Sequence, residues 1–169
     1  FDVVVYDIEE SRVETLVDAG AAAADSGSEV GHRADVVFLS LPHDGALEAA
    51  TLGDAGVVEG LGDGDVLIDT STVSPMASER VAEACDAAGV GFLDAPVSGG
   101  ARNAETGDLT VLVGGEAAVL ERVRPPLDAI AKTVHHVGPQ GAGVTLKVVN
   151  NYLLGVNQIA LSEGLAMAR

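Results

Sequence analysis

The chain has 169 residues, of which 47% are hydrophobic, and a formal net charge of -17 at pH 7. This length and hydrophobic content allow one packed domain, or one domain and part of another, and argue against a disordered chain. The strong negative charge argues against nucleic acid and membrane surfaces as partners, because both carry negative charge themselves.

Residue usage points to a reducing, saline environment and to no metal site. Arginine outnumbers lysine seven to two beside 26 acidic residues, a composition typical of proteins kept soluble in high salt, or alternatively of an ordinary acidic protein. Cys85 is the only cysteine, so we expect a buried thiol and a cytoplasmic location. His135 and His136 alternate along a predicted strand without metal-ligand spacing around them. No stretch reaches the ~18 consecutive apolar residues of a membrane-spanning helix, and no signal peptide is expected.

Short apolar runs alternate with helical patterns up to residue 138. The runs that we predict as strands are, in chain order, residues 3–6, 35–41, 65–71, 91–97, 109–115 and 133–138. Because these strands are continuously apolar and are separated by helices, they favour a mostly parallel sheet covered on both faces. The predicted fold class is therefore α/β, with a doubly wound, Rossmann-like sheet that binds ligands at the carboxyl ends of its strands.

A long helix is predicted over residues 141–169, which contain no proline. Apolar residues lie on nearly every face of this helix, so we expect it to be buried between layers or against another chain. Its few polar side chains follow one stripe, formed by Lys147, Asn151 and Gln158.

Lys147 is a candidate general acid/base. An ammonium buried without a partner costs several kcal/mol, so a lysine on an apolar helix must reach either water or a cleft. Snorkelling, with the stem packed and the ammonium in water, is the alternative. Asn151 lies one turn later and could hold a polar ligand beside the amine, which favours the cleft. Desolvation lowers the pKa of a lysine, which suits acid/base chemistry.

Two segments at predicted strand ends carry candidate binding residues. The backbone N–H groups and hydroxyl of Ser98, Gly99 and Gly100 could hold a small carboxylate, although these residues also suit an ordinary turn. Asp7 stands where an acidic residue binds the adenosine ribose of NAD; it also suits the N-terminus of the next helix, and the two roles are compatible. Ile8 rather than an arginine follows it, so we expect no cation beside a 2′-phosphate, and NAD is favoured over NADP.

The order of these segments is similar to that of one known family. The chain resembles the 3-hydroxyisobutyrate dehydrogenase branch of the β-hydroxyacid dehydrogenases, relatives of 6-phosphogluconate dehydrogenase, in VVVYD, VFLSLP, VLIDTSTVSP, GVGFLDAPVSGG, LTVLVGG and HHVGPQGAGVTLKVVNN. The resemblance covers essentially the whole chain, and FLDAPVSGG and GAGVTLKVVNN are its specific segments. It implies hydride transfer between NAD and a small carboxylate substrate in a dimer or tetramer.

The resemblance also implies roles for single residues. It makes Lys147 the catalytic lysine and Asn151 the residue that orients the substrate. The substrate carboxylate would be held by Ser98, Gly99 and Gly100. The cofactor would be contacted by Asp7 at the ribose and, on the nicotinamide side, by Leu41, Pro42 and Thr72.

The chain departs from the family pattern at both ends. The family begins with a strand and a G-x-G-x-x-G loop that binds the cofactor pyrophosphate, and neither precedes Phe1. The helical domain that follows the long helix is also absent, so we expect an interior fragment of a parent of roughly 290 residues. The expected parts are a dinucleotide-binding domain, 1–138, whose sheet lacks its first strand, and a long interdomain helix, 139–169, that begins the C-terminal helical domain.

Two hypotheses for the function follow. The first is an NAD-dependent dehydrogenase of a small 3-hydroxy acid, of the 3-hydroxyisobutyrate or tartronate semialdehyde type. The second is a non-catalytic relative or truncated product that acts only as an assembly module. Lys147 and Asn151 favour the first for the parent, whereas the missing Gly-rich loop favours the second for the chain by itself. We expect the chain by itself to be inactive, because a missing central strand leaves backbone groups unpaired.

Overall fold

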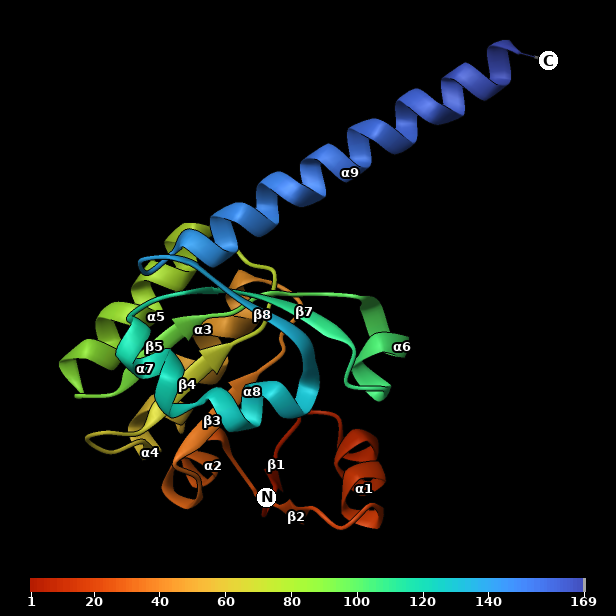
Figure 1. Ribbon diagram of the computed structural model, residues 1–169. Coiled ribbons are helices and arrows are strands. Elements are labelled where there is room, and N and C mark those ends of the chain that lie inside the picture. Colours follow the sequence, from red (N-terminus) through yellow and green to blue (C-terminus); the bar gives the residue numbers. More distant parts are fainter. Residues whose placement is uncertain (169) are drawn as a thin grey trace.

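The computed structural model describes residues 1–168 and has the predicted α/β, doubly wound fold (Figure 1). The strand order of the main sheet is β3-β4-β5-β7-β6, with β8 paired to β7. Pairing is parallel from β3 to β5 and between β7 and β8, and antiparallel where β7 meets β5 and β6. The strands are β3 (Val36–Leu39), β4 (Val66–Asp69), β5 (Gly91–Asp94), β6 (Val97–Ser98), β7 (Leu109–Gly114) and β8 (Ala131–Gly138).

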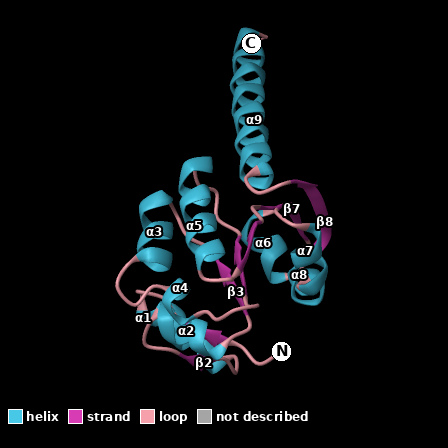
Figure 2. Ribbon diagram, turned by 90° about the vertical axis from the view of Figure 1, so that its left-hand side faces the viewer, coloured by secondary structure: helices cyan, strands magenta, loops and turns pink. Residues whose placement is uncertain are grey.

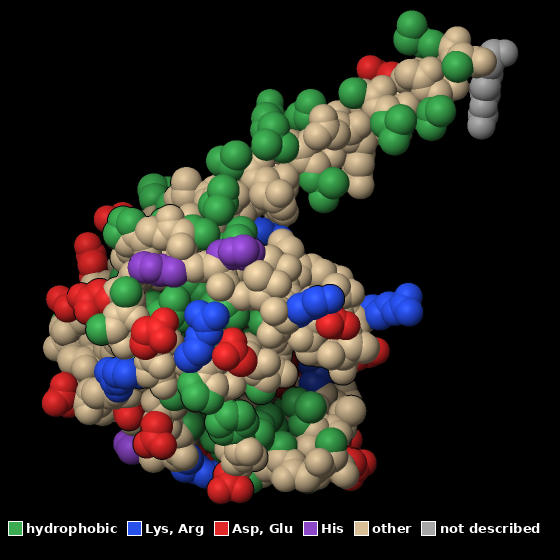
Figure 3. Space-filling model, viewed as in Figure 1, with side chains coloured by type: hydrophobic (Ala, Val, Ile, Leu, Met, Phe, Trp, Pro, Cys, Tyr) green, Lys and Arg blue, Asp and Glu red, His purple; other side chains and the backbone are tan. Residues whose placement is uncertain are grey.

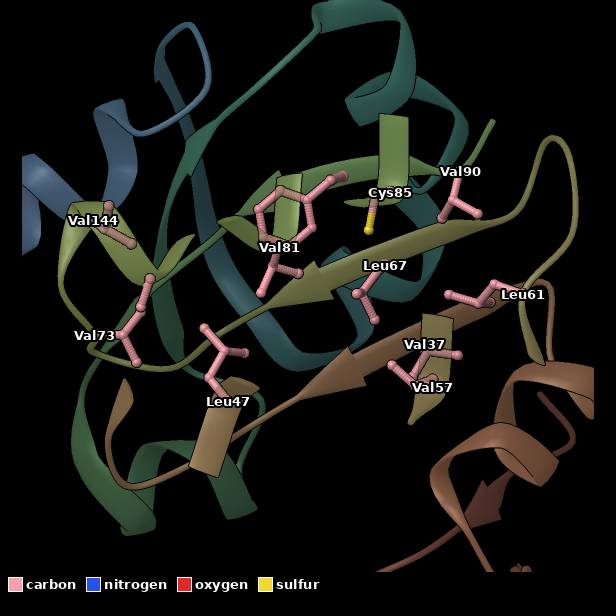
Figure 4. Packing of buried hydrophobic residues seen from close by; sticks show 12 residues of the cluster. Val37, Leu47, Val57, Leu61, Leu67, Val73, Val81, Cys85, Val90 and Val144 are labelled. Atoms are coloured by element: carbon pink, nitrogen blue, oxygen red, sulfur yellow. The ribbon is translucent and has the colours of Figure 1, made fainter. Parts of the chain in front are cut away.

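Helices cover both faces of the main sheet (Figure 2). One face packs against α3 (Asp44–Leu52), α4 (Val57–Gly60) and α5 (Pro75–Ala87), and the other against α7 (Ala117–Arg122) and α8 (Arg124–Ile130). Successive residues of β4 alternate between these layers, because Leu67 belongs to the first core cluster and Ile68 to the second. Figure 4 shows the first cluster, which has Val73 and Val144 at one end.

A second, two-stranded sheet lies apart from the main one. It pairs β1 (Val4–Val5) with β2 (Ala22–Ala23) and carries α1 (Glu10–Asp18) and α2 (Gly27–Arg33). Within residues 1–168, β1 pairs only with β2, and β3 pairs only with β4. The first strand of a doubly wound sheet lies between the second and the fourth. The break between β1 and β3 therefore falls where the sequence predicts a missing strand.

Several local features differ from the sequence-based prediction, and the strand expected over residues 91–97 is two strands, β5 and β6. β2 lies in an alanine-rich stretch that has no strand-forming pattern. The segment between β7 and β8 forms two helices, α7 and α8, which meet at Val123 just before Pro125 and Pro126. Gly100–Glu105 forms a short helix, α6, where only a loop was expected.

The long helix α9 (Ala142–Met167) is buried only at its start, so it is not buried between layers of this chain, and the alternative of burial against another chain stays a prediction. Its buried residues are Gly143, Val144 and Lys147, in the turns that rest on β5, β7, β8 and α5. Beyond them the helix projects from the body of the molecule (Figure 1) and exposes hydrophobic side chains along its length (Figure 3). None of the described helices is long and apolar enough to cross a membrane.

Candidate active site

Lys147 faces the sheet from the second turn of α9 and meets Ser98. Lys147 is 8% exposed, and its Nζ donates a hydrogen bond of 2.8 Å to Oγ of Ser98. Burial lowers the pKa of the Lys147 ammonium from its ordinary value. The amine therefore ends in a polar contact within the molecule rather than snorkelling to water, and its lowered pKa favours the neutral form that can accept a proton.

The loop after β5 presents Ser98 and two glycines at this position. Ser98 lies in β6, which pairs antiparallel with β7, so its backbone is held by the sheet. Gly99 has φ of +136° and Gly100 has φ of +72°, conformations that residues with side chains rarely adopt. A Cβ on Gly99 would lie 2.8 Å from Cβ of Asn103, so this turn also requires the absence of a side chain. Both glycines are exposed, which leaves their backbone accessible to a ligand.

Asp94 links the segment that carries Ser98 to the start of the helix that carries Lys147, and it was assigned no role from the sequence. Its carboxylate accepts the backbone N–H of Gly141 at 2.7 Å and of Val144 at 2.8 Å, at the start of α9. Burial raises the pKa of the Asp94 carboxyl, and the hydrogen bonds from Val144 and Gly141 oppose that rise. The sequence contains one signal of this contact: an acidic residue that ends a buried apolar strand needs donors, and a helix N-terminus supplies them.

The residues predicted on the nicotinamide side lie in two loops at the carboxyl ends of neighbouring parallel strands. Leu41 and Pro42 follow β3, and Thr72 follows β4. The loops are tied together because the Leu41 N–H donates to Oγ of Ser71 at 2.9 Å. Leu41 is half-buried against the first core cluster, whereas Pro42 and Thr72 are exposed. The structure thus brings these three residues to one edge of the sheet.

Asp69 ends β4 beneath these loops and is completely buried. Its Oδ1 accepts the N–H of Ser71 at 3.0 Å, and its Oδ2 has no partner among the described residues. Burial raises the pKa of Asp69, the hydrogen bonds from Ser71 oppose the rise, and the nearby charge of Asp94 adds to it. Asp69 and Asp94 are paired in register across β4 and β5.

Neither Asp7 nor Asn151 makes a hydrogen bond to Lys147 or Ser98 among the described residues. Oδ1 of Asp7 accepts the N–H of Glu9 at 2.9 Å, and its Oδ2 lies 3.5 Å from Nη1 of Arg12. The expectation that no cation stands beside Asp7 was therefore wrong, because the first turn of α1 supplies Arg12. Asn151 is exposed one turn beyond Lys147 and makes no side-chain hydrogen bond to the residues described.

Cys85 is a packing residue of α5 within the first core cluster. It is fully buried, and burial raises the pKa of its thiol to about 12. This confirms that Cys85 acts as a small apolar residue rather than as a nucleophile. Across residues 1–168, no three histidine, cysteine or acidic side chains come together in a way that could hold a metal ion.

Comparisons with known proteins place the chain in one family. Residues 1–138 match the NAD binding domain of 6-phosphogluconate dehydrogenase. The chain is 40% identical over 165 residues to the 2-(hydroxymethyl)glutarate dehydrogenase of Eubacterium barkeri, covering 98% of this chain and 55% of that protein. It is 40% identical over 163 residues to the NAD-dependent L-serine dehydrogenase of Pseudomonas aeruginosa, covering 96% of this chain and 55% of the relative.

A solved structure is similar over nearly the same region. The 3-hydroxyisobutyrate dehydrogenase of Mycobacterium tuberculosis with L-serine superposes with a TM-score of 0.91 at 33% identity, covering 96% of this chain and 55% of that one. The chain thus spans about half the length of the curated relatives it matches. These matches confirm the resemblance found in the sequence, and NAD is the cofactor of the matched domain. The chain belongs to the family of the NAD binding domain of 6-phosphogluconate dehydrogenase.

Proposed function

We propose that the protein is an NAD-dependent dehydrogenase of small 3-hydroxy acids, with Lys147 as general acid/base. The observation that carries this proposal is the 2.8 Å hydrogen bond from Nζ of Lys147 to Oγ of Ser98, which joins residues 49 positions apart. The names of the relatives support the substrate class. L-serine, 3-hydroxyisobutyrate and 2-(hydroxymethyl)glutarate all carry a hydroxyl on the carbon next to the α-carbon of a carboxylate.

Lys147 moves the proton of the reaction. In the oxidation of an alcohol, the neutral amine takes the hydroxyl proton while a hydride leaves the carbon that carries the hydroxyl. In the reverse direction, the ammonium returns the proton. NAD, when bound, supplies the nicotinamide carbon that accepts the hydride. The lowered pKa of Lys147 supports this role, because a lysine with an ordinary pKa holds almost no neutral amine near pH 7.

The loop of Ser98, Gly99 and Gly100 holds the substrate carboxylate in this proposal. Its glycine backbone is exposed and permits close approach of an anion, and its hydroxyl lies beside the Lys147 amine. Asn151 lies one turn farther along α9 and orients the polar part of the substrate. A carboxylate bound at this loop therefore brings the neighbouring hydroxyl toward Nζ.

The cofactor lies along the carboxyl edge of the sheet in this proposal. Its nicotinamide half contacts Leu41, Pro42 and Thr72. The hydrogen bond from Leu41 to Ser71 connects the two loops and supports a preformed binding surface. Asp7 contacts the ribose and favours NAD over NADP by repelling a 2′-phosphate. Arg12 offsets part of that repulsion, so we expect a moderate preference for NAD.

The remaining expectations concern the setting of the enzyme. Residues 1–138 form the dinucleotide-binding domain, and residues 139–169 begin a helical domain. The exposed apolar side chains of α9 support a homo-oligomer, in which this helix is covered. The buried free thiol of Cys85 supports a cytoplasmic location, and the acidic composition supports a saline one.

The direct test is NAD reduction with a panel of small 3-hydroxy acids. The assay compares the chain by itself with a chimera that joins it to the flanking segments of the Pseudomonas aeruginosa relative, of which the match spans 55%. We expect turnover in the chimera and none in the chain by itself. A folded chimera that binds NADH but oxidises none of the acids would contradict the proposal and favour the assembly module.

A further inference from the structure

We propose that Asp94 is the positioning residue that holds the amine of Lys147 against Ser98, an inference that rests on the proposed role of Lys147. Asp94 ends β5 and is completely buried. The chain runs from it directly into the segment that carries Ser98. Its carboxylate accepts the N–H groups of Gly141 and Val144, at the start of the helix that carries Lys147. A single side chain therefore joins both halves of the site.

Hydrogen bonds and the backbone connect Asp94, Ser98 and the start of α9 in a closed loop. The Nζ–Oγ bond of 2.8 Å links Lys147 to Ser98, and the Val144 N–H, less than one turn before Lys147, returns to Oδ2 of Asp94 at 2.8 Å. Ser98 is held independently, because its strand pairs with β7 opposite Thr110. If the start of α9 shifts, Ser98 cannot follow it. Loss of the Asp94 hydrogen bonds is therefore expected to separate Nζ from Oγ.

Two glycines show how closely α9 rests on this carboxylate. A Cβ on Gly143 would lie 2.8 Å from Oδ2 of Asp94, and a Cβ on Gly114 would lie 2.5 Å from Oδ1. Both distances are shorter than ordinary contacts, so neither residue can carry a side chain without moving the helix or the strand. The positive end of the helix dipole also favours the ionised carboxylate at this point. Asp94 is thus enclosed by α9 on one side and β7 on the other.

Asp69 is a matched control for Asp94. The two residues are directly paired across β4 and β5, and both are completely buried. Asp69 accepts the N–H of Ser71 in its own loop and makes no hydrogen bond to α9 among the described residues. Replacing Asp69 by asparagine therefore changes a buried carboxylate in the same layer without changing the attachment of the helix.

The test uses the titration of lysine side chains by NMR, which requires no enzyme activity. The chain contains two lysines, so lysine-labelled protein gives one signal from Lys147 and one from the exposed Lys132 as an internal reference. Asp94→Asn keeps one acceptor oxygen and loses the charge, whereas Asp94→Ala loses both acceptors. We expect the pKa of Lys147 to rise toward the ordinary lysine value in both variants, more in the alanine variant, because the released amine becomes hydrated.

Each outcome separates the positioning role from other roles. Asp69→Asn should leave the Lys147 titration unchanged, and the Lys132 signal should stay fixed in every variant. An unchanged Lys147 titration in Asp94→Asn would overturn the proposal. A fall in the Lys147 pKa would also overturn it, because that is the effect of removing a nearby negative charge without moving the amine. A dehydrogenase assay that fails bears on the proposed function alone.

A measurement on the unaltered chain covers the case in which the Asp94 variants do not fold. Protonation of Asp94 at low pH removes charge from the acceptor of the Gly141 and Val144 amides. The amide signals of these two residues and the side-chain signal of Lys147 should then shift together over one acidic pH range. If the Lys147 signal stays fixed while the two amides shift, Asp94 does not position the amine.

Discussion

Replacing Gly143 with alanine adds a methyl group at the point where α9 rests on the sheet. The new Cβ would lie 2.4 Å from the carbonyl oxygen of Leu112 and 2.6 Å from that of Asp94. Both neighbours are backbone atoms of central strands and cannot rotate away. Because ordinary contacts begin near 3.4 Å, the helix must retreat by about 1 Å from β5 and β7.

The cost of this retreat follows from two opposing effects. Overpacking a tight contact costs about 1–3 kcal/mol. Alanine is preferred over glycine in a helix by up to about 1 kcal/mol, which offsets part of the loss. We expect Gly143→Ala to lower the free energy of unfolding by about 1–2 kcal/mol, measured by urea denaturation followed by circular dichroism.

Gly155 supplies the control in the same helix. Outside the backbone of its own helix, a Cβ on Gly155 would meet no atom of the described residues within 4 Å, so Gly155→Ala should keep or raise the stability through helix preference alone. If Gly143→Ala is as stable as Gly155→Ala, α9 does not rest on the sheet as the structure has it. The geometry derived for Lys147 and Asp94 would then fail with it.

Three further predictions concern charge, packing and cofactor choice. Burial raises the pKa of Asp69, so the folded state binds its proton more tightly than the unfolded state. The resulting stabilisation is present at acidic pH and is lost as the pH rises through the pKa of the folded state. Asp69→Asn should therefore raise the free energy of unfolding at neutral pH, with the gain disappearing in acid, and an equal effect at all pH values would contradict this. Leu67→Ala removes a completely buried side chain and should cost about 2–5 kcal/mol in urea unfolding, whereas Leu153→Ala on the exposed part of α9 should change the stability by less than about 0.5 kcal/mol. In the chimera, Asp7→Ala should weaken the preference for NAD over NADP and Arg12→Ala should strengthen it, as measured by kcat/KM for each cofactor; no change in either variant would remove both residues from the cofactor site.

β4, β5 and β7 could be predicted because each is a mostly apolar run whose residues are largely buried. β2 could not, because Ala22 and Ala23 are exposed and alanine has little preference for strands. The stop of α7 at Val123 could have been predicted from Pro125 and Pro126, which lack the N–H groups needed to extend α7 and lie in the first turn of α8, where proline is tolerated. Local sequence rules thus predict the elements wherever burial or proline determines them.

Of the predicted site residues, the structure joins Lys147 and Ser98 directly, and the sequence did not predict that contact. Lys147 and Ser98 lie in recognisable sequence motifs, but the 2.8 Å hydrogen bond between them depends on how α9 crosses the sheet. Asp94 was missed because its donors, Gly141 and Val144, are distant in the sequence and contribute backbone N–H groups, which carry no residue-specific signal. Long-range backbone contacts of this kind become visible only when the strands and the helix are assembled.

The central claim is that Lys147, held beside Ser98, transfers the proton, and the turnover of Lys147→Ala tests it most directly. In the chimera with a 3-hydroxy acid that it oxidises, kcat should fall by about 10² to 10⁴, because loss of a general acid/base typically costs that much, while substrate KM changes less. Lys132→Ala removes the other lysine, at an exposed position, and should leave kcat unchanged. Added primary amines should restore part of the lost turnover in Lys147→Ala. A Lys147→Ala enzyme with unimpaired kcat would contradict the account.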